Sequence, residues 1–298
     1  MLHLFSAFSR LSATARGILL MLTAIFLFTA MDAVVKGLVD RYPSPMLVWM
    51  RMLGQLLLVV ALLRQRFPSH LRTRFAGLHV ARAMTQLGAA ALFFTSLSYI
   101  GLAEATAIMD INPVLITLGA ALFLGERFGP RRLFGVAAAL MGALIVIRPG
   151  SGILSAAAFL PLCAALFYAA NALITRRIGQ QESIWTAMAL TSVIGTGLIS
   201  LSLPFFWVPI RAEDLPAFAL VGLLGTAAQF AIIRALTLAE ASVVAPFAYS
   251  GIVFATGWGI VLYGAYPDRW TVIGALVIVV AGLYVWHREA QATAESRT

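Results

Sequence analysis

One apolar stretch of the sequence holds polar residues of types that bind small charged molecules. Residues 101–116 read GLAEATAIMDINPVLI, with a carboxylate at Asp110, an amide at Asn112 and a helix breaker at Pro113. A carboxylate can bind an ammonium group, and a proline frees the backbone carbonyl four residues earlier, here that of Met109. We predict that this stretch forms a wall of a binding pocket with a hinge at Pro113. The alternative is a proline kink in which Asp110 bonds to a neighbouring helix.

Further polar side chains lie inside apolar segments, at depths that follow from a rise of about 1.5 Å per residue. Charges and amides are costly in lipid, so we expect them to face the interior of a helix bundle. The predicted substrate-binding residues are His79, Gln86, Tyr99, Asp110, Asn112, Tyr168, Asn171, Gln229 and Tyr249. Two of them have a second interpretation: His79 also fits a packed, hydrogen-bonding side chain, and Tyr99 fits the aromatic belt at a membrane surface.

Many of these positions share one helix face with other polar residues. The sets spaced by three and four residues are Thr106–Asp110–Pro113–Thr117, His79–Arg82–Gln86, Tyr168–Asn171–Thr175 and Thr29–Asp32–Lys36. This spacing places side chains on one side of a helix. Such a face often serves helix packing, but four of them at similar depth favour a shared central site.

Charged residues nearer the membrane surfaces have a different expected role. Asp32 and Lys36 are four residues apart, and Arg51 lies at a similar outer depth. We expect either an ion-pair cluster that helps to close the outer side or a purely structural cluster. Arg82 and Arg234 lie near inner helix ends, from which long side chains are expected to reach the water.

Membrane-spanning helices must position these residues. The chain has 298 residues, of which 61% are hydrophobic and 11% are charged, whereas a soluble domain is about a quarter charged. Apolar runs of about 20 residues recur, as membrane crossing requires. The ten predicted spans are 17–39, 45–66, 76–99, 102–124, 131–148, 156–178, 184–203, 215–238, 241–263 and 270–287. The predicted fold is therefore all-α and integral to the membrane.

The basic residues indicate an orientation rather than a nucleic-acid partner. The net charge is +9, but the 21 Lys and Arg residues lie mainly in short gaps between apolar runs. With the N-terminus inside, thirteen fall in inner segments, four in outer segments and four within spans. Inner loops of membrane proteins carry such an excess. We therefore expect a multi-pass protein of a bacterial inner membrane, with both termini in the cytoplasm.

Two matches indicate an internal repeat. LAEA occurs at 102–105 and again at 238–241, and Glu104 is expected to cap the helix that the first copy begins. Further on, GERFGPRRLFG at 125–135 matches GAYPDRWTVIG at 264–274 in its glycines and one arginine. Matches in the same order are typical of a duplicated unit. A chance match between alanine-rich stretches is the alternative.

A duplicated five-span unit has a mechanical consequence. Five is an odd number, so the second copy runs in the opposite direction through the membrane, and Pro246 is expected to act as a hinge that matches Pro113. Inverted repeats favour alternating access around a central site. The expected organisation is a cytoplasmic N-terminus (1–16), a first five-helix repeat (17–148), a second, inverted repeat (149–287) and a disordered cytoplasmic tail (288–298).

Several motifs together resemble the EamA family of the drug/metabolite transporter superfamily. They are Lys36 ending the first span, Pro45…Arg51 opening the second, LSYIGLAEATAIMDINPVLITLGAALFLGE at 97–126, and Arg131…Gly135 opening the fifth. The second copy departs from the pattern, because Ala265 stands where Glu126 would repeat. The resemblance covers roughly residues 10–290. It implies a ten-helix export carrier with a pocket between the halves, most similar to the YddG-type exporters of amino acids.

The polar groups of the central zone indicate the substrate class. By depth this zone holds a carboxylate, amides and tyrosines but no permanent cation, and a phosphate group would require one. We expect a small zwitterion with an apolar or aromatic side chain, whose ammonium approaches Asp110 or an aromatic face. Carriage of drugs, purines or vitamins is the alternative. Proton coupling through Asp110 and simple facilitated export both remain open.

An enzyme is the rival of another class. AYSG at 248–251 loosely resembles the GxSG of intramembrane serine proteases, but Ala248 replaces the glycine and His79 is predicted far from Ser250. No HExxH motif or cysteine cluster is present, and Cys163 is the single cysteine. We therefore expect no enzyme, metal or cofactor. The expected partners are a small-molecule substrate and membrane lipid, with no nucleic acid, and the protein is expected to be a monomer or weak dimer.

Overall fold

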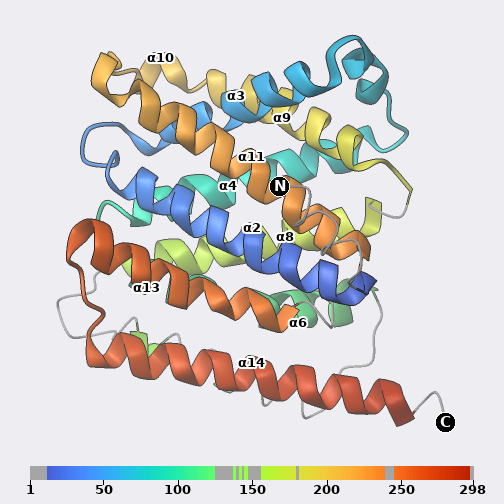
Figure 1. The fold of residues 1–298 in the computed structure, drawn as a ribbon, viewed down its shortest axis with the longest axis vertical. Coiled ribbons are helices and arrows are strands. Elements are labelled where there is room, and N and C mark those ends of the chain that lie inside the picture. The colour runs from blue at the N-terminus through green and yellow to red at the C-terminus, as the bar shows by residue number, and fades with distance from the viewer. Residues whose placement is uncertain are drawn as a thin grey trace.

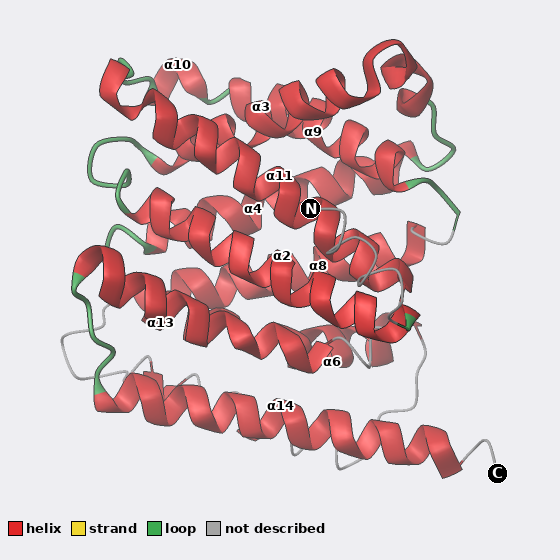
Figure 2. Cartoon of the chain, in the orientation of Figure 1, coloured by secondary structure: helices red, strands yellow, loops and turns green. Residues whose placement is uncertain are grey.

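The structure is a bundle of helices that run roughly parallel or antiparallel to one another (Figures 1 and 2). This computed structural model describes residues 12–124, 137–138, 141–142, 144–146, 156–178, 181–238 and 245–295. Within these residues every regular element is a helix. The all-α prediction is confirmed for this part of the chain.

The α-helices are α2 (Ala13–Lys36), α3 (Ser44–Leu63), α4 (Ala76–Ser96), α5 (Leu102–Met109), α6 (Asn112–Leu124), α8 (Phe159–Ile178), α9 (Ile184–Ser200), α10 (Leu203–Phe206), α11 (Leu215–Leu238), α13 (Ser250–Tyr263) and α14 (Arg269–Glu295). The short 3₁₀ helices are η1 (Arg64–Leu71), η2 (Ala156–Ala158), η3 (Ala212–Asp214) and η4 (Ala245–Tyr249). Most of the predicted span 131–148 lies outside the described residues.

Length and apolarity single out the segments that can cross a membrane. Three stretches meet both conditions within the described residues, Ala15–Lys36, Ser44–Leu71 and Ala212–Ala235, and four shorter apolar helices accompany them. The buried side chains of the largest cluster come mainly from α2, α3, α4 and α5. Many large apolar side chains on the outside of the bundle remain exposed, as Leu57 and Val261 do at 61% and 75%. An apolar exterior is what a lipid environment requires.

The sequence prediction for the C-terminus was wrong over its first part. Residues 288–298 were expected to be disordered, but α14 continues to Glu295. The segment HREAQATAE is rich in alanine, glutamate and glutamine, which have high intrinsic helix propensity. A polar composition therefore ended the membrane span without ending the helix.

Two of the predicted spans depart from a continuous α-helix within the described residues, and we call them the broken helices. The first separates into α5 and α6, and Asp110 caps the end of α5 with φ −67° and ψ 0°. Pro113 is the second residue of α6, a position in the first helical turn where proline needs no backbone N–H partner. In the other span the 3₁₀ helix η4 contains Pro246 and precedes α13. Within the described residues, each departure lies at the proline that was expected to interrupt the helix.

The helices of the two predicted halves pack across each other. The helix α2 lies against α11, and α4 lies against α8. Likewise α11 contacts α3 while α4 contacts α9, and α13 contacts α2 while α6 contacts α8. If each helix of one predicted half is replaced by the corresponding helix of the other half, the first contact of each pair becomes the second. The broken helices meet directly, because α5 contacts α13 and α6 contacts η4.

Two glycines allow a very close approach between the halves. A Cβ atom at Gly54 of α3 would lie 2.5 Å from Cα of Gly222 of α11. Such a distance is too short for any side chain, so this crossing requires glycine on both helices.

The two ends of the described chain lie on the same side of the bundle. In Figure 1 the start of α2 and the end of α14 are both at the right, while the loop from α13 to α14 is at the left. This placement agrees with an even number of passes.

Candidate functional site

Asp110 lies where the two broken helices and α2 converge. A Cβ atom at Gly251 of α13 would be 3.6 Å from Oδ1 of Asp110, 3.7 Å from Cγ2 of Thr106 and 3.4 Å from Cγ2 of Ile25. Tyr249, which directly precedes α13, is 6% exposed and interacts electrostatically with the Asp110 carboxylate. The predicted pocket wall and the counterpart span thus share one junction.

Polar atoms at this junction are buried and unpaired. Among the residues that the structure describes, four buried polar atoms have no hydrogen-bond partner: Oδ2 of Asp110, Oγ1 of Thr106, Oδ1 of Asn112 and the hydroxyl of Tyr249. The large majority of buried polar atoms in proteins do have one. The contrast indicates atoms that are left for water or for a ligand. The alternative in which Asp110 bonds to a neighbouring helix receives no support from its Oδ2 atom.

Three other predicted binding residues differ in burial and in whether their amides have hydrogen-bond partners. Gln86 of α4 is 7% exposed, and neither atom of its amide has a partner. Asn171 of α8 instead donates its amide to the carbonyl of Arg82 at 2.8 Å and to the hydroxyl of Thr85 at 3.3 Å, so it joins α8 to α4. Gln229 is half-buried on α11. Gln86 has the free groups that a ligand would use, and the Asn171 nitrogen does not.

Tyr99 lies in the turn after α4 and is 69% exposed. The prediction that it lines the pocket was wrong for this structure. An aromatic ring at the end of a span is typical of the membrane interface.

Arg51, the eighth residue of α3, is enclosed by side chains of neighbouring helices. Its guanidinium carbon is 5.6 Å from the ring centre of Phe28 and 6.0 Å from that of Phe94. It interacts electrostatically with Asp32 and Tyr168, and its Nε atom is buried without a hydrogen-bond partner. Arg51 is thus a permanent cation enclosed among the helices, and its depth nearer the outer side stays a prediction.

The expected ion pair between Asp32 and Lys36 is replaced by another contact. The ammonium of Lys36 donates to the carbonyls of Leu97 and Ile100, the latter at 3.1 Å. These carbonyls follow α4 and are left without helical partners, so a cation there satisfies them. Asp32 interacts with Arg51 instead.

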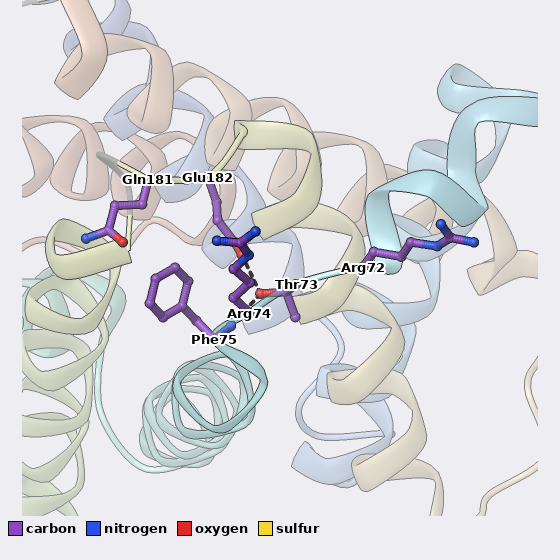
Figure 3. A pocket seen from close by; sticks show the side chains of 6 residues that line it. All are labelled: Arg72, Thr73, Arg74, Phe75, Gln181 and Glu182. Carbon is purple, nitrogen blue, oxygen red and sulfur yellow. Dashed lines mark hydrogen bonds between the residues drawn. The ribbon is translucent and has the colours of Figure 1, made fainter.

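His79 belongs to a contact on the side where the chain begins. Its Nε2 atom lies 2.6 Å from Oε2 of Glu182, in the connection between α8 and α9. Thr73 donates to the same carboxylate (Figure 3). Burial alone would raise the pKa of Glu182, but hydrogen bonds from Thr73 and His79 hold it below its ordinary value. His79 therefore joins α4 to the second half and is not near Asp110, which agrees with its second interpretation.

An open pocket of about 520 Å³ lies beside this contact. Its lining residues are Arg72, Thr73, Arg74, Phe75, Gln181 and Glu182. In Figure 3 Arg72 points away from the bonded Thr73 and Glu182. Phe75 and Gln181 lie on the opposite side of that pair from Arg72.

Arg82 does not reach the water as expected. It is 1% exposed, and its guanidinium donates to the hydroxyl of Thr175 at 2.8 Å, the carbonyl of Ala187 at 3.1 Å and the hydroxyl of Thr191 at 3.2 Å. These acceptors on α8 and α9 satisfy the charge inside the bundle, so the side chain has no need of the interface.

A contact on the opposite side was missed by sequence reasoning. Asp214 of η3 is 4% exposed, and its carboxylate accepts from the hydroxyl of Tyr42 at 2.7 Å and pairs with Arg41 at 2.8 Å. The backbone N–H of Arg211 donates to the same Tyr42 hydroxyl at 3.0 Å. Opposite charges in two short loops were the available signal, but the hydrogen-bonded residues Tyr42 and Asp214 are 172 positions apart.

The residue that a protease would use is engaged in helix structure. The hydroxyl of Ser250 donates to the carbonyl of Phe247 at 2.7 Å, and His79 is paired with Glu182. This geometry provides no base for Ser250.

The chain is similar to known membrane transporters. Residues 15–148 and 155–286 each match the model of the EamA-like transporter family. The chain is 29% identical over 271 residues to the pseudopaline exporter CntI of Pseudomonas aeruginosa, covering 89% of this chain and 94% of that one. It is 29% identical over 280 residues to a riboflavin transporter of Rhizobium johnstonii, covering 92% and 91%. It is 22% identical over 220 residues to an S-adenosylmethionine uptake transporter of Rickettsia prowazekii, covering 74% of each chain.

A solved crystal structure shares the fold, with a TM-score of 0.64 over 91% of this chain and 96% of that one at 20% identity. The family matches together span most of the length of the chain. The relatives are carriers of different small molecules, which establishes the class of function and leaves the substrate open. The chain therefore belongs to the EamA-like transporter family and is a small-molecule transporter of the drug/metabolite transporter superfamily, an integral membrane protein rather than an enzyme.

Proposed function

We propose that this protein exports small amphipathic metabolites, above all neutral and aromatic amino acids, as the YddG-type exporters of its superfamily do. The observation that carries the proposal is the group of buried, unpaired polar atoms at the junction of the broken helices. They include the carboxylate of Asp110 and the hydroxyls of Thr106 and Tyr249. A transport site must bind polar groups that it also releases, and atoms without a protein partner meet this condition.

The chemistry of the junction fits a zwitterion. The Asp110 carboxylate is an acceptor for an ammonium group, and the Tyr249 hydroxyl can serve as donor or acceptor. The amide of Gln86 on α4 is a further buried donor and acceptor that has no partner among the described residues. Apolar side chains such as Ile25 and Ile111 border the same junction and suit an apolar substrate side chain.

The transport cycle proposed here is alternating access between two inverted five-helix repeats, 17–148 and 149–287. Its support is the reciprocal packing of the halves, in which α2 with α11 corresponds to α4 with α8. Broken helices at the centre of each half are typical of carriers built from inverted repeats. Pro113 and Pro246 would then act as hinges.

The proposed setting is a bacterial inner membrane, with both termini in the cytoplasm and the protein a monomer or weak dimer. The excess of basic residues in the segments on the side of the termini supports this orientation. The contact of Glu182 with His79 then lies on the inner side, and that of Asp214 with Arg41 on the outer side.

A panel of substrates in proteoliposomes tests the proposal. Purified protein should move radiolabelled tryptophan, phenylalanine and leucine, and should not move a hexose phosphate. Asp110→Asn should lower amino-acid transport strongly, because the amide lacks the charge that binds the ammonium. Glu213→Gln, a change of an exposed carboxylate in an outer loop, is the matched control and should transport as the wild type does. Hexose phosphate uptake without amino-acid uptake would contradict the proposal.

The second candidate function is carriage of a larger metabolite. The names of the relatives favour it, because one transports riboflavin and another S-adenosylmethionine. Both compounds belong in the same panel. Saturable riboflavin transport in the absence of amino-acid transport would replace the first proposal by the second.

A further inference from the structure

Arg51 is a cation inside the bundle that no protein group neutralises at close range. Within the described residues its guanidinium makes no hydrogen bond and no close ion pair, and Nε is buried without a partner. The rings of Phe28 and Phe94 lie near the guanidinium. A Cβ atom at Gly225 of α11 would lie 3.4 Å from Nε, so α11 also borders the group. The side chain is thus placed between α2, α4 and α11 with its donors available.

The charges around Arg51 leave room for a further anion. Asp32 interacts with it electrostatically without closing to hydrogen-bond distance, and Tyr168 is the second interacting group. Aromatic rings stabilise a cation but accept no hydrogen bond in the ring plane from a guanidinium. Arginine presents a planar set of donors that matches a carboxylate with two parallel hydrogen bonds. The ligand chemistry that completes the site is a carboxylate group.

The neighbours of Arg51 and Asp110 on α2 give an approximate separation of the two groups along that helix. Both groups lie beside the same face of α2: Gly251 adjoins Ile25 and Asp110, while Arg51 lies over Phe28. Ile25 and Phe28 are separated by about 4.5 Å along the helix axis, and Ile25 and Asp32 by about 10 Å, at about 1.5 Å per residue. An α-amino acid with one hydrogen bond of about 3 Å at each charged end spans a comparable distance.

We propose that Arg51 forms a second subsite of the transport site and binds the carboxylate of the substrate, opposite an ammonium subsite at Asp110. This inference rests on the proposed amino-acid transport. It changes the role of Arg51 from a gate on the outer side to a group that contacts the substrate. A purely structural role, in which Arg51 serves only to attract Asp32 of α2, is the competing account.

A matched pair of ligands separates these accounts. Tryptophan and tryptamine share the indole ring and the ammonium, and only tryptophan has a carboxylate. Binding of each radiolabelled compound to the purified protein should favour tryptophan by about tenfold or more, as expected for hydrogen bonds to a charged group. This measurement needs no mutation, and equal affinity of the wild type for both compounds would overturn the proposal.

Variants of Arg51 provide the second measurement. Arg51→Gln should weaken tryptophan binding about tenfold or more and leave tryptamine binding within about twofold. Arg51→Lys retains the charge without the planar donors and should have an intermediate effect. Arg234→Gln removes a cation from an exposed position on α11 and should change neither affinity.

The outcomes distinguish the two proposals. If Arg51→Gln weakens both ligands equally, the residue is structural and the carboxylate subsite is wrong, while amino-acid transport stands. If the wild type binds neither compound and moves no amino acid, the proposed function fails, and the subsite fails with it.

Discussion

Asp110 has a buried carboxylate oxygen without a hydrogen-bond partner, and a single proton at this position would change the charge of the site. The same group can therefore bind the substrate ammonium, carry a proton, or exchange one for the other. Sequence reasoning identified this residue from its depth and its neighbouring proline. The burial of its oxygen is what distinguishes it from a carboxylate used in helix packing.

Transport by the Asp110→Asn variant, with and without a pH gradient across the liposome, tests its role. We expect at least a tenfold loss of amino-acid uptake at equal pH, because a charged hydrogen bond to the substrate is lost. We also expect the response to a pH gradient to disappear. Unchanged uptake in both conditions would show that Asp110 neither binds the substrate nor carries a proton.

Glu182 permits a prediction about stability and pH. Its folded-state pKa is lowered from an ordinary 4.5, so its ionised form stabilises the folded protein above that pH, and this contribution is lost as the pH falls through the lowered value. Glu182→Gln should lower the thermal midpoint by an amount that is constant between pH 5 and pH 7 and decreases below about pH 4.5. Thermal unfolding of both proteins in detergent measures it. A difference between the two thermal midpoints that grows as the pH falls would contradict this account.

Glu104 and Arg82 show which residue roles a sequence can predict. The cap at Glu104 was confirmed, because its carboxylate accepts from the N–H of Gly101 at 2.8 Å, three residues away. The contacts of Arg82 with Thr175 and Thr191 were not foreseen, since they are 93 and 109 positions away. Local hydrogen bonds follow from local spacing, whereas distant partners depend on the packing of helices.

At the scale of elements, a proline does not by itself produce a break. Pro45 is the second residue of the unbroken α3, and Pro113 is the second residue of α6. The difference is that α6 follows α5 after only two residues, so Pro113 prevents their fusion into one helix.

These two prolines form a matched pair for testing the hinge. Pro113→Ala should reduce the turnover rate several-fold with little change in substrate affinity, because alanine allows α5 and α6 to become continuous and stiff. Pro45→Ala should leave both parameters close to those of the wild type. Initial rates at varied tryptophan concentration in proteoliposomes provide both values. A loss of affinity at constant turnover would place Pro113 in the binding site instead.

The crossing of α3 and α11 has its own prediction. Gly54→Ala would place Cβ against Gly222 at 2.5 Å, and we expect a loss of about 1–3 kcal/mol from this overpacking. Gly197→Ala on α9 is the control, since nothing lies within 4 Å of its Cβ position; it should be neutral or stabilising by up to about 1 kcal/mol. Thermal unfolding in detergent compares them. Equal thermal midpoints of the Gly54→Ala variant and the wild type would show that α3 and α11 can move apart at Gly54 without a loss of stability.

At the scale of the whole molecule, a carboxylate contact between described residues joins the two halves at each end. Glu182 links to His79 and Thr73, and Asp214 links to Tyr42 and Arg41. Alternating access requires that such contacts open at one end at a time. The sequence predicted the all-α fold and the break between α5 and α6, but neither of these end contacts, because loop residues of opposite halves become neighbours only in the folded bundle.

Weakening either contact should shift the exposure of the centre. In a Cys163→Ser background, a cysteine at Thr106 should react faster with an impermeant maleimide from outside when Asp214→Asn is present, and more slowly when Glu182→Gln is present. Glu213→Gln, an exposed pair member, should have no effect. Labelling rates in right-side-out vesicles measure these shifts. A parallel change in both variants would mean that the contacts only stabilise the fold.

The long final helix α14 has a practical consequence for how the protein can be observed. With 27 residues and a rise of about 1.5 Å each, it extends about 40 Å, whereas the hydrocarbon layer is about 30 Å thick. The helix is thus about 10 Å longer than one crossing of the hydrocarbon layer requires. A fluorescent reporter joined to the C-terminus would be held away from the rest of the bundle by this excess length, so tagging there should leave uptake measurements undisturbed.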